Sequence, residues 1–174
     1  MKKTLCAALL VASSLLGAAA ARAQEGRGPS TPQEREQAVR LARGLESEPL
    51  HRDAKKAREW FTFWLIQVPD ISVELCGDYL GPVAGSKKDY SSEIFTQMMY
   101  SSAAFIIEYP DRAKDRVAVN LAGVEGALKA YEAILKEKPK ARREFLDGLV
   151  ARREKGELRA YVEDVTQNKC KAKQ

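Results

Sequence analysis

"RAKDRVAVNLAGVEGALKAYEAILKE", residues 112–137, is the stretch of this sequence that decides its fold class. Its large apolar residues recur at alternating intervals of four and three positions, which is the spacing of one face of an α-helix. They are Val117, Leu121, Val124, Leu128, Tyr131 and Leu135. The stretch is therefore expected to form one long helix with a continuous apolar seam.

A row of small residues runs beside this seam, four positions apart, and consists of Ala118, Ala122, Gly126 and Ala130. Small side chains allow a second helix to approach closely. Oppositely charged side chains four apart, Glu125 with Lys129 and Glu132 with Lys136, mark the side that faces solvent. We expect this helix to organise a bundle by contacting at least two other helices.

The beginning of the first helix is indicated by a capping box. In "TPQE" (31–34), Thr31 is placed to cap the helix while Glu34 bonds back to the capping residue. The helix is expected to end at about Ser47. Residues 24–30, which precede it, are polar and contain glycine and proline, so we expect a disordered leader there.

A second helix is predicted between Asp53 and Pro69, and it carries many of the aromatic residues. Its apolar side chains occupy nearly every side of the helix, which is typical of a central, buried helix. They are Ala57, Trp60, Phe61, Phe63, Trp64, Leu65 and Ile66. A short helix capped by Asp70 and continuing to Cys76 is expected to follow.

Prolines and glycines divide the remainder of the chain into further helices. No run of alternating β-branched residues predicts a strand. The fold class is therefore predicted to be all-α: a single-domain bundle of about six or seven helices over residues 31–170, followed by a flexible tail at 171–174. The boundaries of the later helices are expected at Asp89 or Ser91, Pro110, Pro139 and Gly156.

Residues 1–23 have the features of a secretory signal peptide. Two lysines come first, a short apolar run follows, and "ARA" (21–23) has the small-x-small form of a cleavage site. We expect cleavage after Ala23 and a periplasmic or secreted protein. The apolar run is too short for a membrane span.

The charge balance gives no indication of nucleic-acid binding. The chain has 29 lysines and arginines against 24 acidic residues, but three of the basic residues lie in the predicted signal peptide. The remaining chain is close to neutral, at about +2, and lacks the basic excess of a nucleic-acid-binding domain. No later apolar run is long enough to span a bilayer.

Two cysteines follow the predicted signal peptide, Cys76 and Cys170. In an oxidising compartment such a pair is expected to form one disulfide, and two free thiols are the alternative. The single histidine, His51, has no second soft ligand near it in the sequence, so neither a metal site nor another cofactor is predicted.

The stretch "CGDYLGPVAGSKKDYSS" (76–92) interrupts the helical pattern with three glycines. It is not a phosphate-binding loop, because only three residues lie between its neighbouring glycines, where the motif has four, and Ser86 precedes the lysines. It could be an exposed loop that contacts an acidic or aromatic partner. The alternative is a connector whose glycines end one helix before the next. The candidate partner-binding residues are Tyr79, Lys87, Lys88 and Tyr90.

No set of residues predicts catalysis. Ser101 and Ser102 fall within a helix without a histidine to activate them, and the acidic pair Glu144 and Asp147 falls on a charged helix face. We expect a binding protein without catalytic activity, such as an immunity-type protein or an envelope adaptor. Its partner would be another protein or an envelope component.

Two other classes of function stay open at this stage. One is a hydrolase with carboxylates placed between helices, since buried carboxylates can carry out acid–base chemistry. The other is a small-ligand carrier with an aromatic-lined cavity beside Trp60 and Trp64. A core role for these aromatic residues is the simpler expectation.

Part of the chain resembles a known family. "ELCGDYLGPVAG" (74–85) followed by "QMMYSSAAFIIEYPDRA" (97–113) is similar to the layout of Tai-type periplasmic immunity proteins, which neutralise secreted cell-wall amidases. The likeness covers roughly residues 74–112. It implies an exported helical protein that acts by binding an enzyme. The second cysteine that this family carries shortly after its first is absent here, so the resemblance implies no disulfide partner for Cys76.

Overall fold

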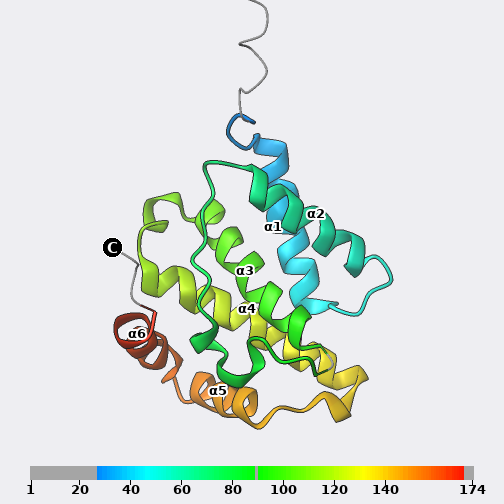
Figure 1. The fold of residues 1–174 in the computed structure, drawn as a ribbon, viewed down its shortest axis with the longest axis vertical. Coiled ribbons are helices and arrows are strands. Elements are labelled where there is room, and N and C mark those ends of the chain that lie inside the picture. Colours follow the sequence, from blue (N-terminus) through cyan, green and yellow to red (C-terminus); the bar gives the residue numbers. More distant parts are fainter. Residues whose placement is uncertain (1–26, 89, 171–174) are drawn as a thin grey trace, which may run out of the picture.

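The structure is a computed structural model that describes residues 27–88 and 90–170, and all the regular secondary structure of these residues is helical (Figure 1). The predicted signal peptide, the first residues of the leader and the tail at 171–174 lie outside the described residues. The all-α prediction is confirmed. The described residues form six α-helices: α1 (Pro32–Ser47), α2 (Ala54–Gln67), α3 (Ser91–Glu108), α4 (Arg116–Glu137), α5 (Glu144–Glu154) and α6 (Leu158–Asn168).

Four short 3₁₀ helices lie between these elements: η1 (Gly77–Tyr79), η2 (Gly81–Val83), η3 (Pro110–Arg112) and η4 (Pro139–Ala141). The last three begin at or next to a proline, which fixes the backbone angle φ and cannot donate to a preceding turn. Two predicted helix starts are therefore corrected: α4 begins at Arg116 rather than 112, and α5 begins at Glu144 rather than Pro139. Among the described residues, no helix is both long and apolar enough to cross a membrane.

Helices α3 and α4 form the centre of the bundle (Figure 1). α4 packs most extensively against α3 and also contacts α1, α5 and α6. Its predicted role as the organising helix is thus confirmed. The predicted capping box of α1 is also present, with Thr31 accepting from the Glu34 amide and Glu34 accepting from the Thr31 amide.

The close approach of α3 to α4 depends on two glycines of α4. A Cβ atom at Gly123 would lie 2.8 Å from the carbonyl oxygen of Met98, and one at Gly126 would overlap the side chain of Ser101. Gly126 belongs to the predicted row of small residues, whereas Gly123 was not singled out. Both positions are occupied by glycine because the neighbouring helix leaves no space for a side chain.

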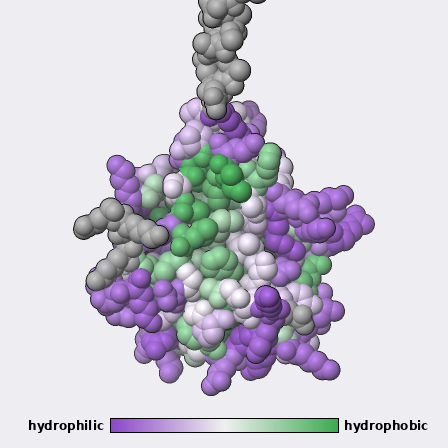
Figure 2. Space-filling model, in the orientation of Figure 1, coloured by the Kyte–Doolittle hydropathy of each residue, from purple (hydrophilic) through white to green (hydrophobic). Residues whose placement is uncertain are grey.

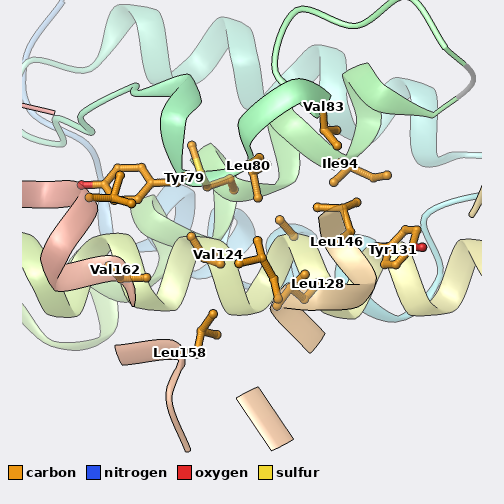
Figure 3. Close-up of a cluster of buried hydrophobic side chains, with 14 of the residues drawn as sticks. Tyr79, Leu80, Val83, Ile94, Val124, Leu128, Tyr131, Leu146, Leu158 and Val162 are labelled. Atoms are coloured by element: carbon orange, nitrogen blue, oxygen red, sulfur yellow. The ribbon is translucent and has the colours of Figure 1, made fainter. Parts of the chain in front are cut away.

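The apolar side chains form two clusters. The larger one fills the space between α4, α5, α6 and the loop that precedes α3 (Figure 3). The other lies between α1, α2, the second half of α3 and the beginning of α4. The larger cluster includes the fully buried side chains of Tyr79, Leu80, Ile94, Val124, Leu128, Tyr131, Leu146 and Val162.

The prediction that residues 53–69 form a central, buried helix is wrong. Helix α2 lies at the edge of the bundle, where it packs on α1 and reaches α3 through Tyr100. It buries Phe61 and Trp64, but Phe63 is 64% exposed and Ile66 is 78% exposed. The small side chains that allow central packing belong to α3 and α4, so α2 buries only one of its apolar faces.

The short helix predicted from Asp70 to Cys76 is absent, and residues 71–76 are not helical. The Asp70 carboxylate, expected to cap that helix, instead accepts from the amide and hydroxyl of Ser30 at 2.8 and 2.7 Å. It also accepts from Arg35 at 2.7 Å. The Asp70 carboxylate therefore bonds residues earlier in the chain rather than the backbone that follows it.

Cys76 and Cys170 form the predicted disulfide, with their Cα atoms 5.9 Å apart. The bond attaches the end of α6 to the extended segment, not to the expected helix ending at Gly77. Cys76 has extended backbone angles, φ −131° and ψ 118°. Since the two residues are 94 positions apart, the disulfide joins the last helix to the middle of the chain.

Candidate partner-binding groove

The glycine loop at 76–92 is packed against α5 and does not stand free. Gly81 has φ +51°, and a Cβ atom there would lie 2.6 Å from the ring of Phe145. A Cβ atom at Gly77 would lie 2.8 Å from the Cβ of Ala84. The two glycines therefore bring η2 onto α5 and η1 onto η2. Gly81 thus has a packing role in this loop.

Tyr79 is not a surface residue, so its predicted role in partner binding is wrong. Its side chain is fully buried, and its hydroxyl lies 2.9 Å from the hydroxyl of Thr166 in α6. Burial raises the pKa of Tyr79, and the hydrogen bond with Thr166 opposes this effect. The 3₁₀ turn of η1 directs the ring into the larger apolar cluster, which the sequence pattern of a glycine loop did not indicate (Figure 3).

The other three candidates are distributed differently. Lys87 and Lys88 are exposed, and Lys88 lines a hollow. Tyr90 is half-buried, has φ +64° and immediately precedes α3, where it packs against the larger apolar cluster. Neither Tyr79 nor Tyr90 lines the hollow beside Lys88.

The hollow that Lys88 lines is a groove of about 760 Å³ between the glycine loop, α5 and one residue of α6. Its apolar residues are Pro82, Val83, Phe145 and Leu149, and its charged residues are Lys88, Arg143, Arg152 and Glu144. Ser86, Gly148 and Tyr161 complete the lining. A groove of this size can hold several side chains of a partner.

Tyr161 fixes the loop side of the groove. Its hydroxyl is 3.2 Å from the carbonyl oxygen of Asp78 and 3.1 Å from that of Tyr79, and it donates to them. Burial raises the pKa of Tyr161, so the hydroxyl keeps the proton that it donates. The guanidinium of Arg152 lies 5.6 Å from the centre of the Tyr161 ring, within the range of a cation–π interaction.

Arg143 is held at the other end of the groove by the end of α4. Its backbone amide donates to the Tyr131 hydroxyl at 2.8 Å, and that hydroxyl donates to Asp147 at 2.7 Å. Its guanidinium donates to the carbonyl oxygens of Ala141 and Arg142. Burial raises the pKa of Tyr131, which keeps its hydroxyl available as a donor to the carboxylate.

Three basic residues and one acidic residue line the groove, so it favours negatively charged groups. Phe145 and Leu149 add apolar surface next to these charges.

The sequence pattern did not single out Phe145, Gly148, Arg152 or Tyr161 as residues of a binding site. Gly148 is the residue that the sequence could have drawn attention to, because glycine destabilises the interior of a helix. A Cβ atom at Gly148 would meet nothing within 4 Å.

Two smaller hollows lie elsewhere. One of about 480 Å³ lies between α2 and α3 and includes Phe63 and Ile66, and one of about 410 Å³ lies beside α1, α3 and α4. Trp60 and Trp64 line none of the three hollows described here. Their rings stack on each other with centres 5.7 Å apart, and Trp64 is buried in the smaller apolar cluster.

One buried carboxylate, Glu46 of α1, lies between α1, α3 and α4. Only 5% of its surface is exposed, and it accepts from Lys129 at 3.1 Å, from Ser101 at 2.8 Å and from Arg43. Within the described ranges, Glu46 is the only acidic residue that is buried. The hydrolase alternative requires two converging buried carboxylates, and the groove contains the exposed Glu144 instead.

Cys76, Asp78 and Cys170 are the described residues that come close enough to hold a metal ion. The two sulfur atoms are joined in the disulfide and are therefore not thiolate ligands in this state.

Comparisons of this chain with protein-family models, with curated proteins and with solved structures gave no match.

Proposed function

We propose that this protein is an exported helical binding protein that holds an acidic segment of a partner protein in the groove between the glycine loop and α5. The groove is the observation that carries the proposal. It combines apolar surface from Phe145 with the charges of Lys88, Arg143 and Arg152. Apolar contact supplies affinity, while positive charge selects an acidic partner and accelerates association.

The residues that line the groove are also held in place by hydrogen bonds and packing. Tyr161 holds the loop, the Tyr131 hydroxyl holds the backbone of Arg143, and Gly81 lets η2 rest on Phe145. Side chains held in this way lose little conformational freedom on binding. A partner segment would therefore meet a surface that already has its bound shape.

Export is supported by the signal-peptide features of residues 1–23 and by the Cys76–Cys170 disulfide. Disulfides persist in oxidising compartments and are rare in the cytosol. The resemblance of residues 74–112 to Tai-type immunity proteins is consistent with a binding role, because those proteins act by binding an enzyme. An acidic surface of such an enzyme is one form that the partner could take.

The test compares two glycines that both face open space within helices. Gly148→Leu would place a side chain in the groove, whereas Gly44→Leu would place the same side chain on α1, away from it. Each variant is used to capture proteins from the envelope fraction, followed by mass spectrometry. We expect Gly44→Leu to retain the partner and Gly148→Leu to lose it.

A second pair of variants tests the charge. Lys88→Glu with Arg152→Glu reverses two charges of the groove, and Lys55→Glu with Lys56→Glu reverses two exposed charges on α2. Only the groove pair should weaken capture, and raised salt should weaken the wild-type complex. Equal capture by all variants that keep the wild-type fold would show that the groove is not the binding site.

A further inference from the structure

The backbone of residues 71–76 makes no hydrogen bond within the described part of the chain. None of the N–H or C=O groups of these six residues bonds to any residue in the described part of the chain. Backbone polar groups in native proteins are nearly always paired, either within the protein or with water. Ile71 is itself buried, but residues 72–76 are half-buried or exposed, so most of these residues reach the surface with backbone groups that no protein group pairs.

This segment is nevertheless fixed in place at both ends. Asp70, immediately before it, is bonded to Ser30 and Arg35. Near its other end Glu74 accepts twice from Arg116, at 2.9 and 2.6 Å, and Cys76 is held by the disulfide. Because Asp70, Glu74 and Cys76 are restrained, the segment has already lost much of its conformational freedom.

The side chains of the segment pass from buried at its start to exposed near its end. Ile71 is buried and Val73 is half-buried, both against the smaller apolar cluster, whereas Ser72 is exposed and Leu75 is 54% exposed. Figure 2 shows apolar surface gathered over the chain between α2 and η1, on the face turned to the viewer. Exposed apolar surface beside unpaired backbone groups is typical of an edge that accepts another strand.

We propose that Ile71–Cys76 is a docking edge onto which an extended segment of a partner protein pairs by β-strand addition. A second extended backbone complements a row of N–H and C=O groups at matching spacing, as in other strand-addition complexes. Apolar side chains at alternate positions of the partner would cover Leu75. The restraints at Asp70, Glu74 and Cys76 lower the entropy cost of this pairing.

The probe for this edge is a display library of random heptapeptides, selected against the full, oxidised protein. We expect enrichment of sequences with Val, Ile or Thr at alternate positions, which is the pattern of a strand with one apolar face. Leu75→Asp should bind the selected peptides about tenfold more weakly or worse, since an unpaired charge would face their apolar side chains. Ile66→Asp, at another exposed apolar position, should bind them as the wild type does.

Hydrogen exchange supplies the backbone readout. Bound peptide should slow exchange at every second amide of residues 71–76, because consecutive N–H groups of a strand point to opposite edges. A selection without alternating sequences, or binding that Leu75→Asp leaves unchanged, would overturn the inference. Unchanged exchange at residues 71–76 would do the same.

The edge is separable from the groove. Gly148→Leu should bind the selected peptides normally, because Gly148 lies on α5 and not next to the segment. If Gly148→Leu abolishes peptide binding while Leu75→Asp does not, the peptides occupy the groove and the edge is not a docking site. Circular dichroism of each variant shows that its helical fold is intact.

Discussion

Arg116 and Glu74 form a two-pronged ion pair, with nitrogen–oxygen distances of 2.9 and 2.6 Å, that joins the start of α4 to the extended segment. The same guanidinium donates to the carbonyl oxygen of Cys170 at 2.5 Å. One side chain therefore connects α4, the segment after α2 and the end of α6. The disulfide lies at the same junction.

Arg116→Ala should lower the free energy of unfolding by about 1–2 kcal/mol. A partly exposed ion pair contributes at most about 1 kcal/mol, and the bond to the Cys170 carbonyl adds a similar amount. Urea unfolding measures the change. The control is Arg40→Ala, which removes an exposed pair with Glu36 within α1 and should cost less than about 0.5 kcal/mol. Equal losses for the two variants would contradict this role of Arg116.

Replacing both cysteines by serine should destabilise the protein by up to about 4–5 kcal/mol. The disulfide closes a loop of 94 residues, and cross-linking a loop of that length restricts the unfolded chain by about this amount in the entropy model. Mass measurement with and without a reductant tests whether the bond exists. Two free thiols in protein isolated from the envelope would exclude it.

Four helical glycines should respond to alanine in opposite directions. Gly44 and Gly148 face open space, so Gly→Ala should stabilise the protein by about 0.5–1 kcal/mol at each position. At Gly123 and Gly126 the added Cβ atom would collide with α3, so Gly→Ala should destabilise by about 1–3 kcal/mol. Thermal melting measures all four.

Gly126→Leu extends this test to a larger side chain. The variant should be severely destabilised, because α4 would have to move away from both Ser101 and Glu46. If it melts at the wild-type temperature, the packing of α4 against α3 described here is wrong.

Leu128→Ala should cost about 2–5 kcal/mol in the free energy of unfolding. Leu128 is fully buried in the larger apolar cluster, and truncation would leave a cavity between α4 and its neighbours. Leu135→Ala, on the same seam but only half-buried, should cost less. A smaller loss at Leu128 than at Leu135 in urea unfolding would contradict the burial pattern of the seam.

Asp70 should make stability depend on pH in the acid range. Partial burial raises its pKa, but hydrogen bonds from Ser30 and Arg35 outweigh this effect and lower it to about 2. Since the pKa is depressed in the folded state, Asp70 stabilises the protein above pH 4 and loses this contribution as the pH falls towards 2. Asp70→Asn should therefore be less stable than the wild type at pH 6, and the difference should shrink on acidification. A difference that is constant between pH 6 and pH 2 would contradict the assignment.

The helices were predictable because their signals are local. The capping box at Thr31 and Glu34, the seam of α4 and the glycine at 156 each act within a few residues. The disulfide was predictable for a different reason, since only two cysteines follow the predicted signal peptide. The sequence by itself therefore determined the fold class and the covalent link.

The site depended on contacts between residues distant in the sequence. Asp70 could have capped a helix, and it fails to do so because Ser30, forty positions earlier, lies beside it. The sequence pattern predicted that Tyr79 is a surface residue of a glycine loop. In the structure its hydroxyl instead lies next to Thr166 of α6. Local pattern cannot rank such competing partners, because each contact exists only after the helices have packed.

The position of α2 and the formation of the groove also depend on contacts between residues distant in the sequence. Amphipathic periodicity shows which side chains can be buried, but the number of faces that become covered depends on which helices surround each element. Phe63 and Ile66 stay exposed because α3 pairs with α4 through Gly123 and Gly126, leaving α2 at the edge. Only the tertiary structure brings Lys88, Arg143, Arg152 and Tyr161 to one groove, since they belong to segments that meet through the packing of η2 and α6.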